Sequence, residues 1–557
     1  MVSASRRELL AVVSALGIGT GPFQRALAAS AAQEKTDTVT AEMVQQAEWI
    51  AGITLTDAER RTVAAALTNH RQRIAALHKL ELDHAVPPAL AFHPAPWLAP
   101  SCNGRGKVEL AAAQNLQKPA SDDELAFAPL TTLAELIRTR KISSTELTKL
   151  YLARLKKYNP ALLCAVTITE ELALQQAQAA DQAIAAGAYR GPLHGIPWAA
   201  KDLIAYPGYK TTWGAGHFKD QELKVKATVA QRLDDAGAVL LAKTTLGALA
   251  WGDVWFGGMT RNPWNIQQGS SGSSAGTASA VAAGLVGFGL GSETHGSIIS
   301  PSSRCGVTGL RPTFGRVSRH GCMPLSWTLD KIGPMCRSVA DCALVLAAIH
   351  GFDRHDATTQ DRPFHWPVKV NFKELRVGVV EDAAISANDR QVLTDLGVRL
   401  VPITLPRATA NALIGLILDV EAATAFDDIT RAGVKEGIGL WGPTFRRGRF
   451  ITAVDYLTAQ RARTQLMHKM AQVMEQVDMY VGGADLAITN LTGHPTICLP
   501  NGFRGRTPTS LTFTGRLFDE STLLTVAQAY QDATGHHRKR PPQDTWIVEK
   551  KDDPQPR

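Results

Sequence analysis

The sequence predicts an α/β protein whose sheet is covered by helices. From about residue 125 onward, stretches with helical periodicity alternate with short apolar runs, the pattern of strands buried on both faces. Of the 557 residues, 45% are hydrophobic and 20% are charged, so the chain can bury a large core and is neither disordered nor embedded in a membrane. At roughly 150 residues per domain, this length corresponds to about three or four domains.

Charge and cysteine usage argue against nucleic-acid binding and against a disulfide scaffold. The formal net charge is +8, but the excess is spread along the chain and only residues 536–540 form a basic run. The seven cysteines are scattered and none has zinc-site spacing, so each is expected to be a small buried side chain. We therefore expect neither a nucleic-acid partner nor a metal.

Residues 1–29 have the features of a twin-arginine export signal. Arg6 and Arg7 precede an apolar stretch from Leu9 to about Gly21, and the small residues near Ala29 suit a signal peptidase. This stretch of about 13 residues is shorter than the roughly 20 needed to span a bilayer. We expect export to the periplasm or secretion, and a soluble mature protein without membrane contact.

The rest of the chain divides into three predicted regions. Residues 30–124 form a preface of two amphipathic helices between 40 and 80, the second opened by the capping box Thr56–Glu59, followed by a Pro-rich connector. Residues 125–545 form the main domain, and 546–557 form a polar tail.

Several elements of the main domain are predicted individually. We expect a helix from Ser143 to about Lys157, and a helix over 227–236 that leads into a buried strand at 238–242. Further strands are predicted at 375–380, 479–481 and 496–499.

The segment Gly269–Gly276 gives the strongest indication of chemistry, with four serines and three glycines directly before a predicted helix at 277–284. No lysine follows where a phosphate-binding P-loop requires one. Gly272–Gly276 formally matches the GxSxG nucleophile elbow, with Ser274 as nucleophile. That motif needs a strand immediately before it, and Asn262–Gln268 is turn-like. A loop that only caps the helix would leave the serine density unexplained.

Three segments in order resemble the signature segments of the amidase signature hydrolases: 195–202 (GIPWAAKD), 269–276 (GSSGSSAG) and 291–298 (GSETHGSI). Further family-like segments at 306–318 and 490–495 extend the resemblance to roughly residues 125–540. The resemblance implies an α/β/α sandwich with a large mixed β-sheet covered by helices. It makes 125–545 the catalytic domain, preceded by an N-terminal helical extension.

The resemblance also implies a Ser-Ser-Lys catalytic triad and no cofactor. The family lysine falls on Lys201, the bridging serine on Ser273 and the nucleophile on Ser297. In the family the two serines are 24 residues apart, which selects Ser273 over its neighbour Ser274. The family resemblance places a cis peptide before Ser273. It assigns the oxyanion hole to the backbone of three residues: Thr294, His295 and Gly296.

These residue types suit the hydrolysis of a carboxylic amide. Lysine has a pKa near 10.4 and acts as a base only where burial or neighbouring cations disfavour its ammonium form. Neutral Lys201 would accept the proton of Ser273, which would take the proton of Ser297 as Ser297 attacks the carbonyl. Backbone N–H groups would stabilise the oxyanion, where the loss of one donor typically costs about 3 to 4 kcal/mol.

Two positions depart from the family pattern. His295 stands where the family usually has glycine, so its side chain either narrows or polarises the oxyanion region or takes no part in catalysis. Ile299 stands where the family commonly has arginine, so the hydrogen bonding of that arginine must be replaced or absent.

The substrate is expected to be a small-molecule amide with an aryl or medium-sized acyl group. This expectation depends on large apolar residues near the signature segments. These residues either line an acyl pocket or are ordinary core residues. They are Trp198, Trp213, Trp251, Trp255, Met323, Leu325 and Trp327.

Other functions compete with amide hydrolysis. An esterase or carbamate hydrolase would use the same triad. The A-type chain of a glutamine-dependent amidotransferase would work in the cytoplasm with a partner subunit and tRNA, which the export signal contradicts. The helices at 40–80 faintly resemble the small C-type chain of that complex and are interpreted as a docked appendage. A catalytically dead binding protein is disfavoured because the three triad residues are present. A homodimer is only a family-level expectation.

Overall fold

The computed structural model describes residues 38–77, 79–80, 90, 106–109, 116–383, 385–483 and 485–546. The predicted export signal, most of the predicted connector and the polar tail beyond Trp546 lie outside these residues. The described residues fall into two compact units, divided after Lys79. None of the described helices is long and apolar enough to cross a membrane.

The first unit is a pair of helices, α3 (Ala41–Ala51) and α4 (Asp57–Leu77), as the periodicity predicted. The predicted capping box opens α4. The Glu59 carboxylate accepts a hydrogen bond from the Thr56 backbone N–H at 2.8 Å, and the Thr56 hydroxyl accepts one from the Glu59 N–H at 3.4 Å. An ion pair between Glu48 and Arg60, with Oε1 and Nε 2.6 Å apart, joins the two helices.

The second unit is built on a mixed sheet of eleven strands in the order β1-β3-β2-β8-β10-β9-β14-β15-β13-β11-β12. β2 runs parallel to both of its neighbours, and β11 also has two parallel neighbours. The other neighbouring pairs are antiparallel, and two separate hairpins pair β4 with β5 and β6 with β7. The strands are β1 (Ala165–Ile168), β2 (Pro197–Lys201), β3 (Val239–Thr244), β4 (Val254–Trp255), β5 (Gly258–Met259), β6 (Arg261–Asn262), β7 (Asn265–Gly269), β8 (Phe288–Glu293), β9 (Thr308–Arg311), β10 (Lys331–Cys336), β11 (Arg376–Val380), β12 (Arg399–Ile403), β13 (Met479–Val481), β14 (Thr496–Arg504) and β15 (Thr507–Gly515).

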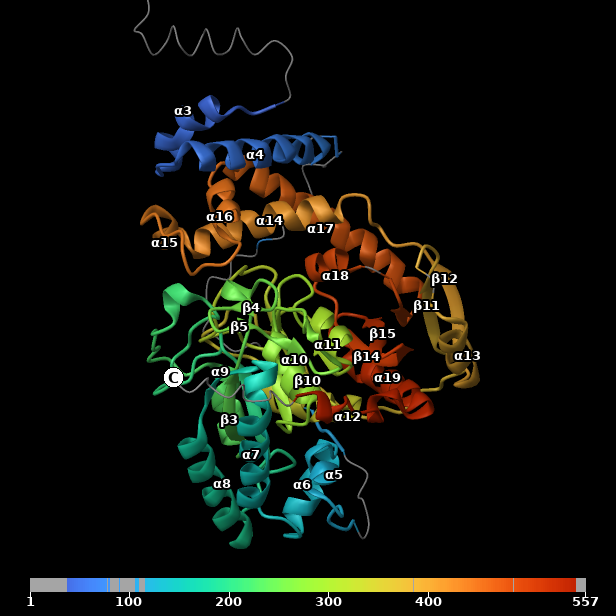
Figure 1. Ribbon diagram of the computed structural model, residues 1–557. Coiled ribbons are helices and arrows are strands. Elements are labelled where there is room, and N and C mark those ends of the chain that lie inside the picture. Colours follow the sequence, from blue (N-terminus) through green and yellow to red (C-terminus); the bar gives the residue numbers. More distant parts are fainter. Residues whose placement is uncertain are drawn as a thin grey trace, which may run out of the picture. The chain divides into compact units, whose positions relative to one another are not determined.

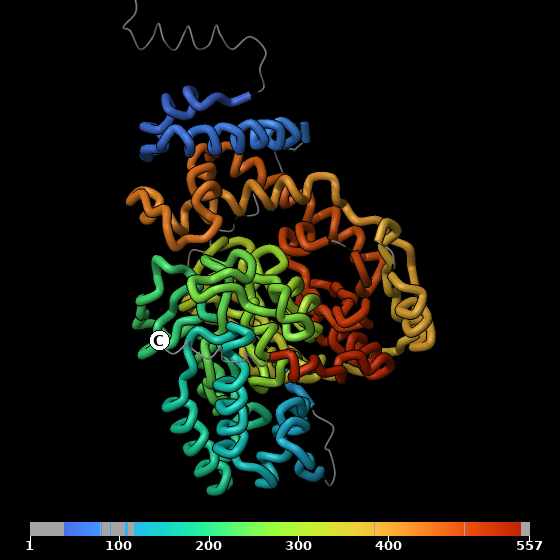
Figure 2. Tube along the Cα trace, in the orientation of Figure 1, coloured from blue at the N-terminus to red at the C-terminus, as the bar shows by residue number. Residues whose placement is uncertain are grey.

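Helices cover this sheet, which confirms the predicted α/β architecture (Figure 1). The trace in Figure 2 shows how the C-terminal strands, in red, lie beside the green middle of the chain, where β14 pairs with β9. The helices are α5 (Asp122–Ala126), α6 (Leu130–Arg138), α7 (Ser144–Leu162), α8 (Glu170–Ala185), α9 (Thr228–Asp235), α10 (Ala275–Ala282), α11 (Ile299–Cys305), α12 (Val339–Ile349), α13 (Ala387–Asp395), α14 (Ala410–Ala425), α15 (Asp427–Arg431), α16 (Gly442–Gly448), α17 (Ala453–Gln476), α18 (Leu486–Thr492) and α19 (Glu520–Thr534), with 3₁₀ turns η1 (Gly216–Phe218), η2 (Ala248–Ala250), η3 (His536–Arg538) and η4 (Gln543–Trp546).

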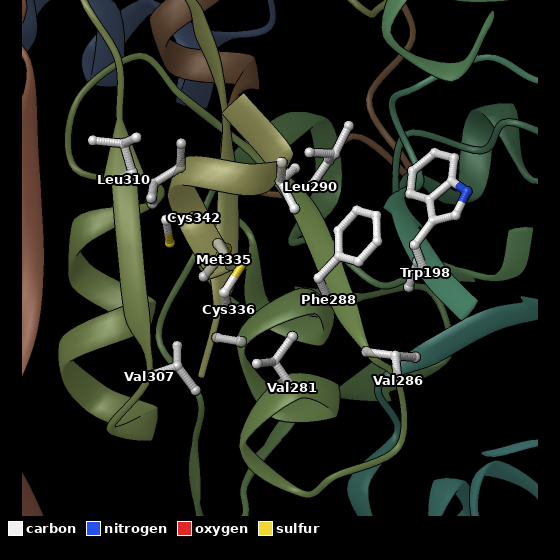
Figure 3. Close-up of a cluster of buried hydrophobic side chains, with 14 of the residues drawn as sticks. Trp198, Val281, Val286, Phe288, Leu290, Val307, Leu310, Met335, Cys336 and Cys342 are labelled. Atoms are coloured by element: carbon white, nitrogen blue, oxygen red, sulfur yellow. The ribbon is translucent and has the colours of Figure 1, made fainter. Parts of the chain in front are cut away.

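The core around β2 and β8 sets the register of the strands that carry the site. Trp198 of β2 stacks on Phe288 of β8 with ring centroids 6.1 Å apart, and both side chains are fully buried (Figure 3). The same two residues are opposite each other in the parallel pairing, and Ala200 is opposite Leu290. This register brings the ends of the two strands, at Lys201 and Glu293, to the same edge of the sheet.

Some boundaries differ from the predicted ones. α7 continues past Lys157 to Leu162 and ends where Leu163 adopts a left-handed conformation, with φ of 49°. The stretch Asn262–Gln268 was predicted to be a turn, and this prediction was wrong because β6 and β7 form a hairpin there. Only Pro263 and Trp264 make the turn. The paired residues are polar, so hydropathy gave no signal for a strand.

Six cysteines lie among the described residues, and none of these forms a disulfide. Five are buried and Cys322 is half-buried. The five buried cysteines are the small interior side chains that the scattered spacing predicted, whereas Cys322 lines the cavity described below.

Candidate active site

Lys201 and the Gly/Ser loop meet at the carboxyl ends of β2 and β8. Lys201 is the last residue of β2, and Ser292 is the last residue but one of the neighbouring parallel strand β8. Ser273 and Ser274 lie in the loop that ends at the start of α10. Functional groups commonly gather at this end of parallel strands because the loops that follow them converge there.

The Lys201 amine is fully buried and is surrounded by serines rather than carboxylates. Its Nζ lies 2.8 Å from Ser273 Oγ, 3.0 Å from Ser274 Oγ and 2.8 Å from Ser292 Oγ. Removal from water lowers the pKa of Lys201 from 10.5 to about 7, although the charges of Asp330 and Glu293 act to raise it. A large fraction of this amine is therefore neutral and able to accept a proton at neutral pH.

The two adjacent serines have different environments. The peptide bond between Gly272 and Ser273 is cis, as the family resemblance implied. Ser274 Oγ donates to the Ser292 carbonyl and accepts from the Ser292 N–H, each at 3.1 Å, in addition to its contact with Lys201. Among the described residues, Lys201 is the one hydrogen-bond partner of Ser273 Oγ. Ser274 is thus held as a structural hydroxyl, while Ser273 keeps capacity for a second proton partner.

Ser297 lies in the turn between β8 and α11, next to these serines. Its carbonyl accepts a hydrogen bond from the Ser274 N–H at 3.1 Å, and its side chain is half-buried. Within the described part of the chain, no hydrogen bond involves the Ser297 hydroxyl or the backbone N–H groups of His295, Gly296 and Ser297. An unengaged hydroxyl and a run of free N–H donors therefore lie together at this turn.

The backbone of the turn requires a glycine at position 296, whereas the side chain at 295 points to solvent. Gly296 has φ of 93°, and a Cβ there would lie 2.9 Å from Ser300 Oγ and 3.0 Å from Leu486 Cδ1. Thr294 is buried and His295 is exposed. The His295 side chain is absent from the lining of the cavity beside the turn.

A buried carboxylate anchors the chain directly after Ser297. Glu293 Oε2 accepts hydrogen bonds from the backbone N–H groups of Ile298 and Ile299 at 2.9 and 3.0 Å. Arg311 Nη1 lies 2.6 Å from Glu293 Oε1, which also accepts from Asn490 Nδ2 at 2.9 Å. Burial alone would raise the pKa of Glu293, but Arg311, Lys331 and these hydrogen bonds hold it at about 2. The ion-pair partner of Glu293 therefore comes from β9 rather than from position 299.

A cavity of about 250 Å³ opens beside these groups. Of the seven apolar residues considered for a pocket, Met323, Leu325 and Trp327 line it. Trp198 lies instead in the core, Trp213 packs on Phe218, Trp251 on Trp441 and Trp255 on Phe256. The other lining residues are Leu203, Ala250, Ser292, Thr294, Arg319, His320, Gly321, Cys322, Pro324, Asp330, Ile332, His355 and Asp356.

The family follows from comparison with known proteins. Residues 146–484 match the family model described as Amidase. The chain belongs to the amidase signature family. It is 35% identical over 481 residues to the A-type chain of glutamyl-tRNA(Gln) amidotransferase from Roseiflexus sp. (strain RS-1), with 74% of this chain and 97% of the relative covered. The corresponding chain of Moorella thermoacetica is 34% identical over 483 residues, covering 75% and 99% of the two chains.

Solved structures agree with this assignment. The native peptide amidase of Stenotrophomonas maltophilia superposes with a TM-score of 0.67 at 29% identity, over 74% of this chain and 98% of that one. This amidase signature enzyme has the geometry of a Ser-Ser-Lys triad, since the buried lysine contacts the serine that follows the cis peptide. Among the described residues, no group of three or more His, Cys, Asp or Glu side chains is arranged to hold a metal ion.

Sequence reasoning missed several residues of the site. Ser292, Glu293 and Arg311 lie inside the recognised segments, but only their three-dimensional contacts reveal what they hold. Asp330 accepts a hydrogen bond from the Thr294 hydroxyl at 2.6 Å and lines the cavity. The one local signal for Asp330 was its position directly before the strand β10.

Replacing Arg311 by methionine should destabilise the fold by about 3 to 5 kcal/mol at pH 7, because the Glu293 carboxylate would stay buried without its ion-pair partner. The native pKa of about 2 lies below the unfolded value of 4.5, so the stability from ionised Glu293 is present above pH 4.5 and is lost as pH falls through 2. In the variant, burial without Arg311 is expected to raise the native pKa of Glu293 above the unfolded value, so that the variant gains stability as its carboxyl group takes up a proton below pH 7.

The difference in the free energy of unfolding between the parent and Arg311→Met, measured by urea unfolding, should therefore shrink as pH falls from 7 to 5. Arg376→Met, which removes a partly exposed pair with Asp478, is the control and should cost no more than about 1 kcal/mol. A pH-independent difference would contradict this account.

Proposed function

We propose that this enzyme hydrolyses the C–N bond of carboxylic amides through an acyl-enzyme on Ser297. The observation that carries the proposal is the 2.8 Å contact between the buried amine of Lys201 and Ser273 Oγ, beside an unengaged Ser297 hydroxyl. A lysine with a pKa of about 7 can serve as a base near neutral pH, which an exposed lysine cannot do.

The proposed proton path follows from these contacts. Neutral Lys201 accepts the Ser273 proton, and Ser273 takes the proton of Ser297 as the Ser297 oxygen bonds to the substrate carbonyl carbon. The N–H groups of the 294–297 turn stabilise the oxyanion. Ser273 then returns the proton to the leaving amine as the C–N bond breaks, and water hydrolyses the acyl-enzyme by the same relay.

A second candidate is the A-type chain of a glutamine-dependent amidotransferase. It is favoured by the function of the two relatives at 34 and 35% identity. Amide hydrolysis is common to both candidates, since an amidotransferase must first release ammonia from glutamine. Esters and carbamates would also suit an acyl-serine mechanism.

Incubation with a fluorophosphonate should place the added mass on Ser297, as located by peptide mapping. Ser297→Ala should abolish the label, and Lys201→Ala should slow it by about 10²-fold or more because the general base is lost. The labelling rate should rise with pH through about 7 and then level off, since deprotonation of Lys201 creates the base.

Ser274→Ala is the matched control for this experiment, since it removes a neighbouring hydroxyl that also contacts Lys201 but leaves Ser297 in place. Label on Ser274 would refute the assigned nucleophile, and a folded protein without any label would refute the proposed mechanism.

Aryl or medium acyl amides should be better substrates than small polar ones, because Met323, Leu325 and Trp327 present apolar surface to the cavity. We expect a higher kcat/KM for benzamide than for acetamide or glutamine. Equal or faster turnover of acetamide would contradict this preference, and glutamine as the best substrate would favour the amidotransferase.

We also propose export by the twin-arginine route, on the strength of Arg6, Arg7 and the apolar stretch that follows them. The mature protein should begin near Ser30 when its N-terminus is sequenced from the exported fraction. Replacing both arginines by lysine should retain the uncleaved protein inside the cell. Export of that variant at an unchanged level would contradict the assignment.

A further inference from the structure

Trp327 presents a large apolar side chain at the cavity beside the serines. Its side chain is 45% exposed, and it lies on the loop 325–330 between Leu325 and Thr328. An exposed indole on an unsupported loop would adapt to many ligands. The chain around Trp327 is instead tied down on both sides of the residue.

Glu421 of α14 holds the residues that flank Trp327. Its Oε2 accepts hydrogen bonds from Ser326 Oγ at 2.6 Å and from the Thr328 N–H at 3.0 Å. Its Oε1 accepts from Thr328 Oγ1 at 2.7 Å and from Tyr456 OH of α17, also at 2.7 Å. The Glu421 side chain is 4% exposed, so water does not compete for these bonds.

Arg463 of α17 holds the same loop from a second direction. Its Nη1 and Nη2 lie 2.8 Å from the hydroxyl and the carbonyl oxygen of Thr328, and its Nε lies 2.6 Å from the Leu491 carbonyl. Burial lowers the pKa of Arg463 to about 10, so the guanidinium is still charged at neutral pH. The nearby Glu421 carboxylate compensates this buried charge.

The loop is also joined to the turn that precedes Ser297. Asp330 Oδ2 accepts from the backbone N–H groups of Leu325 and Ser326 at 2.8 and 2.9 Å, while Oδ1 accepts from the Thr294 hydroxyl. The cavity wall and the Thr294 turn are therefore fixed relative to each other.

We infer that Glu421 and Arg463 are positioning residues that set acyl-group specificity by fixing the Trp327 indole as a rigid wall of the cavity. This inference rests on the proposed function. Both residues act through the loop, since their contacts reach Ser326 and Thr328 but not the reacting serines. A fixed wall favours flat aryl acyl groups, which contact it without the entropy cost of ordering the loop.

The test compares the 4-nitroanilides of benzoic and acetic acid, which share a leaving group and differ in the acyl group. The selectivity, defined as the ratio of their kcat/KM values, should fall about tenfold in Trp327→Ala, the scale expected for lost apolar contact in a pocket. Glu421→Gln should lower it in the same direction, mainly through a higher KM for the benzoyl substrate. The double variant should fall no further than Trp327→Ala, because Glu421 acts through Trp327.

Asp419→Asn is the matched control. Asp419 is also a buried carboxylate of α14, and its ion-pair partner is Arg447 of α16. This variant should lose stability while keeping the parent selectivity. Thr328→Val, which removes one hydroxyl from the network, provides a milder second disruption if Glu421→Gln does not fold.

Unchanged selectivity in Glu421→Gln or Thr328→Val, or an additive double variant, would overturn the inference. Fluorophosphonate labelling of Ser297 in every variant separates this result from failure of the proposed function. If the parent protein is labelled on Ser297 and hydrolyses amides, but its selectivity does not change in Glu421→Gln, only the positioning role is refuted.

Discussion

The burial of the Lys201 amine without a direct carboxylate partner is the constraint on which the site depends. A pKa near 7 rather than 10.5 means that the site destabilises the ammonium form of Lys201 by roughly 5 kcal/mol, at 1.36 kcal/mol per pKa unit. Serine hydroxyls and a backbone carbonyl replace the water that the amine loses. The surrounding strands must be rigid enough to maintain this environment, and the stacked Trp198 and Phe288 pack between β2 and β8.

Two neighbouring carboxylates, Asp202 and Glu293, are each paired with another cation. Asp202 follows Lys201 in the sequence, yet its Oδ1 lies 2.8 Å from Lys243 Nζ and its other oxygen accepts from the Thr212 N–H. Glu293 is paired with Arg311 in the same way. Removing either cation would free a buried carboxylate close to the lysine, which would then favour the ammonium form.

The sequence allowed good predictions where the information is local. Lys201 and Ser273, which the structure brings into contact, lie in short ordered motifs, and the helices and apolar strands of the sheet have their own periodicity. Polar β7 gave no such signal, because main-chain pairing in a hairpin does not need apolar side chains. Which tryptophans reach the cavity could not be predicted either, since this depends on how segments distant in the sequence pack together. The contact of Glu421 with Ser326 spans 95 residues and depends on how α14 packs.

The interior location of the cysteines bears on the environments that the protein can tolerate. Burial raises the pKa of Cys164, Cys322 and Cys498 to about 12, so roughly one such thiol in 10⁵ is ionised at pH 7. The thiolate is the form that attacks disulfides and reacts with oxidants. These side chains are therefore poor substrates for oxidation and for disulfide exchange. The buried thiols among the described residues should therefore survive equally well in a reducing cytosol and in an oxidising compartment outside it.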